Sequence, residues 1–232
     1  DAGGAAYGLQ LGWHSTTGPV VAWAGFDTVS VARFDGSTWV PVAPSAATTV
    51  VHTAQASNST LGLGMALSSL GRPVIAWGDG DWSSHEIYVL AFDGASWDAV
   101  GAGSASSVGI SNTATESAAP VVAMGANDRP VVAWQETIAA GQNEIFLRQF
   151  NGTAWLELAN SAQGGGVSRG GGLATAPALA VGTDNLPMLA WTQRRGGNES
   201  DIYVRKWDGL AWQELGTGSA QTGGVSNNGG PS

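Results

Sequence analysis

Short apolar runs recur along the whole chain, each bounded by Gly, Asn, Asp or Pro. In the last quarter these runs are PALAVG (177–182), PMLAW (187–191), DIYVRKW (201–207) and AWQEL (211–215). They carry β-branched or aromatic residues, which is typical of strands. No part of the pattern has the 3.6-residue apolar period of a helix. The sequence therefore predicts an all-β chain made of short strands.

Two motifs repeat along the chain with the same period. The first is PVVAW at 19–23, PVIAW at 73–77, PVVAW at 130–134 and PMLAW at 187–191. The second is FDGSTW at 34–39, FDGASW at 92–97, FNGTAW at 150–155 and WDGLAW at 207–212. Because both motifs advance by 54 to 58 residues from copy to copy, the chain is four copies of a unit of about 57 residues.

The Asp-Gly and Asn-Gly pairs of the second motif predict tight turns, since such turns need positive φ and glycine has no Cβ to clash there. Each turn joins the third and fourth strands of a unit. The Trp just past the turn is expected to cover the end of the hairpin and to pack between units. These four residues are Trp39, Trp97, Trp155 and Trp212.

A four-stranded antiparallel meander repeated four times predicts a four-bladed β-propeller in a single domain, 1–232. The blades are expected at about 7–60, 61–117, 118–174 and 175–232. The motifs resemble the β-propeller superfamily, in particular kelch-like and lectin-type propellers. The xDGxxW hairpin resembles the WDGxGW turn of small fucose-binding propeller lectins, and loosely the Asp-box turn of sialidases. A leucine-rich or other β-solenoid is the alternative, although its repeats are shorter and its strands parallel.

The two ends of the chain match parts of one connection. The tail TGGVSNNGGPS (222–232) resembles GGGVSRGGG (164–172), which leads into the fourth unit, and YGLQLGW (7–13) supplies the strand that would follow. A closed monomeric ring is therefore expected. An open arc that pairs with a second copy is the alternative.

The amino-acid composition argues against several classes of binding partner. The net charge is −9 with only nine Lys and Arg, so neither nucleic acid nor insertion into a membrane is expected. No apolar run approaches about 18 residues. The chain has no Cys, which excludes disulfides and thiolate metal sites.

Long, irregular connections gather on one face of the predicted disc and tight turns on the other. Binding usually resides on long loops over a rigid scaffold. Four tryptophans end the second strands beside these loops, and they either pack in the core or stack on sugar rings. They are Trp23, Trp77, Trp134 and Trp191.

Two loops add further candidates for ligand binding. Trp82 stands outside the repeat, flanked by Asp79, Asp81 and His85, and either contacts a ligand or plugs the space between blades. The two Asp residues are also candidate calcium ligands, although the loop does not match a full oxygen cage; no cofactor is expected otherwise. Arg194 and Arg195 either contact a carboxylate or form a solvated loop.

Catalytic motifs are absent from the sequence. His14, His52 and His85 occupy unrelated repeat positions, which predicts no metal ring. Glu86, Glu144 and Asp201 precede the third strand in three units, either as an acidic ring or, as expected, as acceptors of hydrogen bonds from loop amides. Sialidase-like chemistry needs an arginine cluster, and the arginines do not share one repeat position. The chain is therefore not expected to be an enzyme.

The function expected from the sequence is a non-catalytic binding propeller, secreted, periplasmic or on the cell surface, with carbohydrate as the leading ligand class. A structural or interaction module that contacts surface proteins in a larger assembly is the alternative, and a sialidase-like glycoside hydrolase is a remote one. Three sequons, at Asn58, Asn151 and Asn198, are candidate glycosylation sites.

Overall fold

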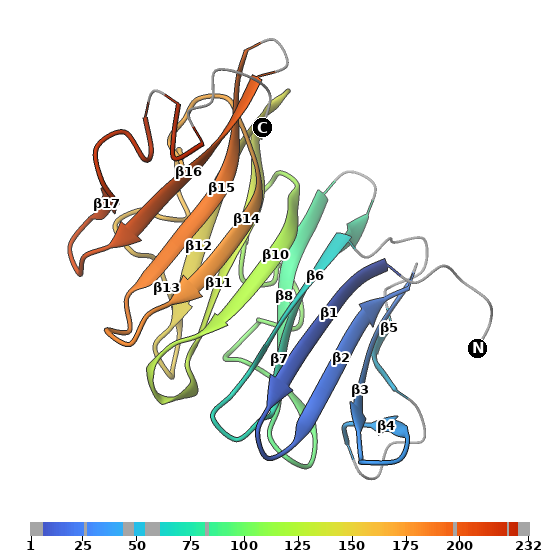
Figure 1. The fold of residues 1–232 in the computed structure, drawn as a ribbon. Coiled ribbons are helices and arrows are strands. Elements are labelled where there is room, and N and C mark those ends of the chain that lie inside the picture. The colour runs from blue at the N-terminus through green and yellow to red at the C-terminus, as the bar shows by residue number, and fades with distance from the viewer. Residues whose placement is uncertain are drawn as a thin grey trace. The chain divides into compact units, whose positions relative to one another are not determined.

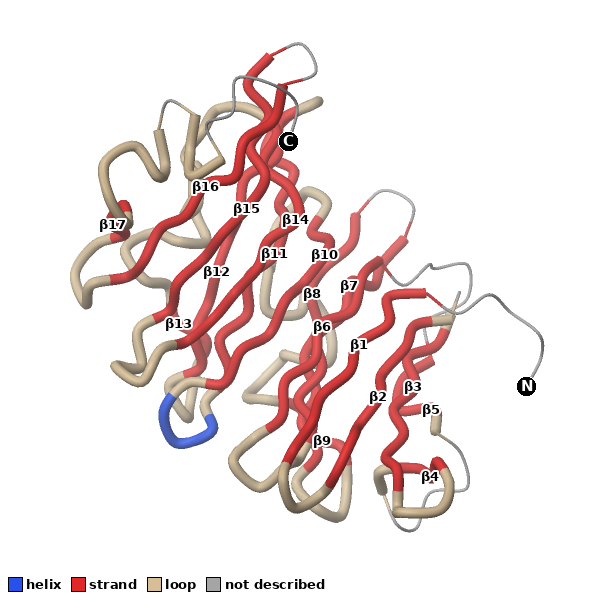
Figure 2. Tube along the Cα trace, in the orientation of Figure 1, coloured by secondary structure: helices blue, strands red, loops and turns tan. Residues whose placement is uncertain are grey.

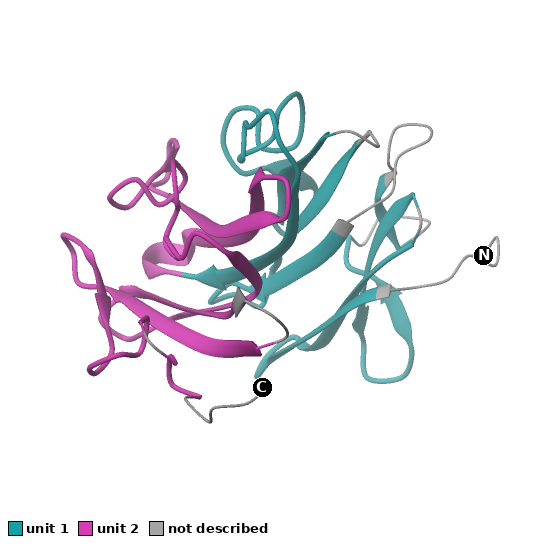
Figure 3. Ribbon diagram, turned by 90° about the horizontal axis from the view of Figure 1, so that it is seen from above, with its two compact units in different colours: residues 1–124 teal, residues 125–232 magenta. Residues whose placement is uncertain are grey.

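The computed structural model describes residues 7–25, 27–43, 49–53, 61–81, 84–196, 199–221 and 223–226. In this part of the chain the protein is all-β, and its single helical element is the 3-10 turn η1 (Ala126–Asp128) (Figures 1 and 2). The chain divides into two compact units, residues 1–124 and 125–232 (Figure 3). The all-β prediction is confirmed, and the architecture is consistent with a β-propeller.

The first sheet of unit 1 is an antiparallel meander with one additional strand. Its strands in order are β1 (Tyr7–His14), β2 (Gly18–Ala24), β3 (Thr28–Phe34) and β4 (Trp39–Pro41). β5 (Val50–Thr53) pairs with β3 beyond the end of β4, opposite Thr28 to Ser30. The sequence did not predict this fifth strand.

The second sheet of unit 1 repeats the meander. Its strands are β6 (Leu61–Leu67), β7 (Pro73–Asp81), β8 (Ser84–Phe92) and β9 (Trp97–Ala99). The last strand of the unit, β10 (Ser117–Met124), lies against β6 and β7. β6 approaches β10 closely, because a Cβ on Gly64 would lie 2.7 Å from the carbonyl oxygen of Pro120.

Unit 2 contains two antiparallel groups of strands joined by one parallel bridge. The strands are β11 (Pro130–Ala139), β12 (Gln142–Phe150), β13 (Trp155–Leu156), β14 (Leu173–Val181), β15 (Pro187–Gly196), β16 (Glu199–Trp207) and β17 (Trp212–Glu214). β13 pairs with β12, and β14 to β17 form a meander. The parallel bridge joins Asn143 to Leu173. The predicted succession of four antiparallel strands is thus present at 7–41, 61–99 and 173–214.

The four tight turns have the same construction. In each, the side-chain oxygen of the Asp or Asn accepts hydrogen bonds from the backbone amides two and three residues later, at 2.7–2.9 Å. The glycine that follows has φ between +100° and +110°. The aromatic residues on either side of each turn contact one another, with ring centroids 5.5–5.8 Å apart. The predicted hairpins are confirmed, and each Trp covers the end of its own hairpin. Packing of these Trp between units stays a prediction, and Trp39 is 48% exposed.

Candidate functional site

Three of the four tryptophans that end the second strands lie in the core. Trp77, Trp134 and Trp191 are at most 1% exposed. Their rings contact aromatic side chains of the adjacent strand, Tyr88, Phe146 and Tyr203 respectively, at centroid distances of 5.8–6.1 Å. Trp23 is half-buried.

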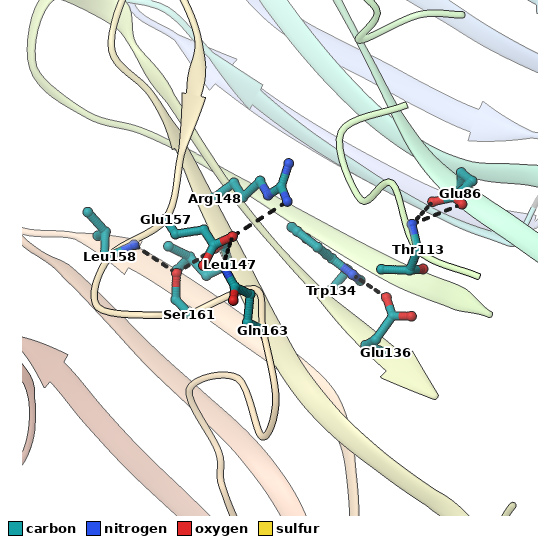
Figure 4. A network of polar contacts seen from close by, with 10 residues as sticks. All are labelled: Glu86, Thr113, Trp134, Glu136, Leu147, Arg148, Glu157, Leu158, Ser161 and Gln163. Atoms are coloured by element: carbon teal, nitrogen blue, oxygen red, sulfur yellow. Dashed lines mark hydrogen bonds and ion pairs between the residues drawn. The ribbon is translucent and has the colours of Figure 1, made fainter. Parts of the chain in front are cut away.

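In two of these three tryptophans the indole N–H donates to a polar side chain two residues along the same strand. Trp134 Nε1 donates to Glu136 Oε2 at 2.8 Å (Figure 4), and Trp191 Nε1 donates to Gln193 Oε1 at 3.1 Å. The equivalent residue after Trp77 is Asp79, whose side chain is one methylene shorter. The buried Nε1 of Trp77 has no hydrogen-bond partner among the described residues.

Each of these polar residues faces an acid across the hairpin. The strand register places Asp79 opposite Glu86, Glu136 opposite Glu144, and Gln193 opposite Asp201. Glu136 and Glu144 are each 1% exposed, while Asp79 and Glu86 are 5% and 7% exposed. Two of the three hairpins therefore carry a pair of buried carboxyl groups on one face of the sheet.

The acids of the third strands anchor the long connections that follow them. Glu144 accepts hydrogen bonds from the Ser168 hydroxyl, from Gly170 N at 3.1 Å and from Gly171 N at 2.7 Å. Glu86 accepts hydrogen bonds from the Ser111 hydroxyl and from Thr113 N, the latter drawn in Figure 4. The expectation that these acids accept hydrogen bonds from loop amides is confirmed for both.

Asp201 accepts a hydrogen bond from the Ser226 hydroxyl at 2.9 Å. All three serines stand in the same short motif, Gly-Ile-Ser at 109–111 and Gly-Val-Ser at 166–168 and 224–226. This motif is the sequence signal that would have identified their partners.

A second polar cluster surrounds Asp79 in unit 1. His52 Nε2 lies 2.7 Å from Asp79 Oδ2, and the His52 ring contacts Trp77 at 4.6 Å. His85 is 4% exposed, and its Nδ1 lies 3.9 Å from Glu116 Oε2. Burial raises the pKa of Tyr88, and the charges of Asp79 and Glu86 raise this pKa further.

Not all of the loop candidates can be placed. Trp82 lies outside the described residues, and the side chains of Asp81 and Arg195 do as well. Asp79 and His85 come from the facing strands β7 and β8. In the described part of the chain no three His, Asp or Glu side chains are arranged to hold a metal ion.

Unit 2 contains a polar cavity of about 410 Å³, which we call the arginine cavity. It lies between the connection after β13, the strands β15 and β16, and the connection after β17. It is lined by Ser168, Arg169, Gly170, Gly171, Gly172, Gln193, Arg194, Tyr203, Arg205, Ala220 and Gln221. Arg194 was a candidate from the sequence, whereas Arg169, Gln193, Tyr203 and Arg205 were missed because they come from different repeat positions.

Backbone carbonyls fix two of the three guanidinium groups. Arg205 Nη1 donates to Val167 O at 2.6 Å, while Arg169 donates from Nε to Gly166 O and from Nη2 to Ala159 O. Burial lowers the pKa of Arg205, and the charge of Arg169 lowers this pKa further, whereas Glu214 and Glu144 raise it. The guanidinium groups are therefore held at the wall of the cavity by neutral partners.

Unit 1 contains a cavity of about 510 Å³ on the side of the tight turns. Arg33, Arg72 and the apolar rings of Phe34 and Phe92 contribute to its wall. The sequence predicted binding on the opposite face. The arginine cavity is built from long connections and so lies where the sequence predicted binding; binding itself stays a prediction.

Of the three sequons, only Asn151 is described. It is exposed, and its Oδ1 accepts hydrogen bonds from Thr153 N and Ala154 N, both at 2.8 Å. Asn58 and Asn198 lie outside the described residues. Glycosylation stays a prediction at all three.

Solved structures share this fold, although no protein family and no curated protein matches the sequence. The α-L-arabinofuranosidase of Lactobacillus brevis is 11% identical at a TM-score of 0.51, over 89% of this chain and 71% of its own. The endo-arabinase of Bacteroides thetaiotaomicron is 11% identical at a TM-score of 0.52, over 90% and 81%. The GH93 α-L-arabinofuranosidase of Fusarium graminearum, solved with arabinobiose, is 12% identical at 0.52, over 92% and 67%. At such identities the likeness concerns the fold alone.

The comparison corrects two predictions made from the sequence. The predictions of a non-catalytic binding propeller and of no enzyme activity are both contradicted by these similar structures, because the three named above are glycoside hydrolases. The remote hydrolase alternative agrees better with this finding. The fold neighbours do not support a kelch-like or lectin-type assignment. Among the described residues no helix is long and apolar enough to span a membrane.

Proposed function

We propose that this chain is a carbohydrate-processing enzyme of the glycoside hydrolase type that binds saccharide in the arginine cavity. We include in the proposal a four-bladed propeller, with one blade per repeat, and a location outside the cytoplasm, where polymeric glycans are encountered. The observation that carries the proposal is the cavity itself, recessed among the long connections of a fold shared with glycosidases.

The cavity offers the groups that bind sugars. Its volume of about 410 Å³ falls within the range of about 300–1,000 Å³ usual for small-molecule sites. Arg194, Arg205 and Gln193 supply hydrogen-bond donors for hydroxyl groups. The Gly170–Gly172 segment adds backbone that a ligand can approach closely, since glycine carries no side chain.

Glycoside hydrolysis requires two carboxyl groups on either side of the scissile bond. Glu136 and Glu144 stand directly opposite on β11 and β12, so their Cβ atoms are about 4.5–5.5 Å apart. Two carboxyl groups on such positions can adopt the separation of about 5–9.5 Å that glycosidases use. Glu144 is connected to the cavity wall through the amides of Gly170 and Gly171.

We therefore assign the carboxyl roles to Glu136 and Glu144. Since each side chain is 1% exposed, substrate reaches the pair only when the Gly170–Gly172 segment moves off Glu144.

The test is hydrolysis of aryl glycosides and of arabinan-type and other plant polysaccharides by the purified chain. We expect release of reducing sugar, and a loss of at least about 100-fold in Glu136→Gln, as is usual for removal of a catalytic acid or base. Folding should survive this change, because the fourth repeat carries Gln193 at the same position and uses it to accept the indole N–H.

Asp79→Asn is the matched control, since it neutralises the equivalent carboxyl group in unit 1. It should leave hydrolysis unchanged. Equal hydrolysis by wild type and Glu136→Gln would show that the pair only supports the fold, and no hydrolysis of any glycoside by the wild type would refute the proposed function.

A further inference from the structure

The arginine cavity has an unusual charge for this protein. The whole chain carries a net charge of −9 and nine Lys and Arg, yet three of these nine residues line this one cavity. No Asp or Glu contributes to the lining. Within the described part of the chain, neither Arg169 nor Arg205 forms an ion pair with a carboxylate.

The two guanidinium groups come from distant parts of the sequence and are fixed in position. Arg205 lies on β16 and is half-buried, and its Nη1 donates a hydrogen bond to Val167 O. Arg169 follows that carbonyl by two residues and is held by Gly166 O and Ala159 O. Arg169 itself is exposed, but its charge acts on the half-buried Arg205, and two like charges held near one another are costly unless an anion joins them.

The lowered pKa of Arg205 indicates that the negative charges around it do not offset its burial and the charge of Arg169. Glu144 and Glu214 act on this group, but burial and Arg169 outweigh them, and the pKa of Arg205 is lowered. A bound carboxylate would act in the opposite direction. Guanidinium groups bind carboxylates through two parallel hydrogen bonds, which gives both affinity and orientation.

We infer that the arginine cavity binds an acidic saccharide, with the carboxylate of a uronic acid residue placed against Arg169 and Arg205. The inference rests on the proposed function in taking the ligand to be a sugar. Gln193 and Arg194 then supply hydrogen bonds for its hydroxyl groups. A sulfate ester presents a related anionic group, and the test separates it from a carboxylate.

The experiment compares matched pairs of sugars by isothermal titration calorimetry. Digalacturonate and cellobiouronate are titrated beside neutral digalactose and cellobiose, at low and at high salt. We expect the acidic member of a pair to bind at least about tenfold more tightly, and this preference to shrink at high salt because part of it is electrostatic.

Variants locate the binding group. Arg205→Gln and Arg169→Gln should each remove the preference, and Arg205→Lys should keep only part of it, because an ammonium lacks the planar fork of a guanidinium. Arg33→Gln removes the same charge from the cavity of unit 1 and should leave the preference unchanged. Circular dichroism and melting confirm that each variant is folded, and Arg205→Lys keeps the test valid if Arg205→Gln does not fold.

The outcomes separate this inference from the proposed function. Hydrolysis of neutral glycosides with no preference for acidic sugars would refute the inference and leave the hydrolase proposal standing. Tight binding of uronates without hydrolysis of any glycoside would support the inference and refute the hydrolase. Equal binding of galacturonate, galactose 6-sulfate and inorganic sulfate would refute it in favour of a general anion site.

Discussion

Each tight turn depends on one glycine with a backbone conformation that no other residue adopts easily. Gly36, Gly94, Gly152 and Gly209 have φ of +104°, +110°, +100° and +101°. The preceding Asp or Asn ties the turn to the amides that follow it. Conformation and hydrogen bonding are therefore specified by adjacent residues, which explains why this part of the structure could be read from the sequence.

Gly209→Val should lower the free energy of unfolding by about 1 kcal/mol or more, because a β-branched residue is strained at positive φ. A Cβ at Gly209 would meet no atom within 4 Å, so the loss would come from the backbone alone. Urea denaturation measures it. Leu210→Val at the neighbouring exposed position is the control and should be neutral; equal stability of both variants would contradict the role of the glycine.

The turn aspartates predict a specific response to acid. Hydrogen bonds from the amides of Thr38, Ser96 and Ala211 lower the pKa of Asp35, Asp93 and Asp208 respectively. A carboxyl group with a lowered pKa stabilises the fold above its unfolded value, near 3.8, and this contribution is lost as pH falls from that value through the lowered pKa.

The measurement is the unfolding midpoint of the wild type and of a triple Asp→Asn variant, followed from about pH 5 to about pH 2. Asn already occupies this turn position at Asn151. At about pH 5 the wild type should be more stable than the triple variant. This difference in stability should shrink as the pH falls below 3.8. A difference that stays constant with pH would mean that these carboxylates do not contribute.

At the scale of elements, the first strands of neighbouring sheets pack through small residues. A Cβ on Gly64 of β6 would lie 2.7 Å from the carbonyl oxygen of Pro120 and 3.0 Å from Cα of Val121 in β10. A Cβ on Gly12 of β1 would instead meet the side-chain atom Cγ of Leu67 at 2.9 Å. A flexible side chain can move away from an added Cβ, whereas the backbone of β10 cannot.

Gly64→Ala should therefore destabilise the protein by about 1–3 kcal/mol, the usual cost of an overpacked core, and by more than Gly12→Ala. Both glycines stand inside a first strand without positive φ, which makes them a matched pair. Thermal melting of the two variants gives the comparison. The packing described between β6 and β10 would be incorrect if Gly12→Ala were the more damaging change.

Some elements of the structure could be predicted from the sequence and others could not. The strands and hairpins follow from periodic apolar residues and local turns. β5 was missed because its pairing with β3 is a tertiary contact outside the repeat. The arginine cavity was missed for the same reason: Arg169 belongs to a connection and Arg205 to β16, and only the fold brings them together. The sequence was searched for arginines at one shared repeat position, and this search could not find Arg169 and Arg205.

At the scale of the whole molecule, one face of β1 is apolar, and no other described residue covers it fully. Leu9, Leu11 and Trp13 are 70%, 72% and 72% exposed. The other face of this strand packs on β6 through Gly8 and Gly12. Apolar surface of this kind on a sheet usually marks a contact.

We expect this face to be covered in solution, so Leu11→Asp should either destabilise the protein or change its mass. Leu210→Asp, at a turn position that is 86% exposed, is the control and should do neither. Light scattering with thermal melting decides the matter. A mass near 23.5 kDa agrees with the monomer predicted from the sequence, whereas neutral behaviour of Leu11→Asp would show the face to be truly bare.

The one turn built on Asn has a chemical consequence that the other three lack. In an Asn-Gly pair the following backbone nitrogen can attack the side-chain amide and release ammonia, because glycine does not shield it. At Asn151 and Gly152 the product is a mixture of aspartate and isoaspartate. Aspartate restores the residue that the other three turns carry, whereas isoaspartate lengthens the backbone and breaks the bonds to Thr153 and Ala154. Among the four tight turns, chemical ageing of stored protein should therefore begin at this one, as a gain of one negative charge.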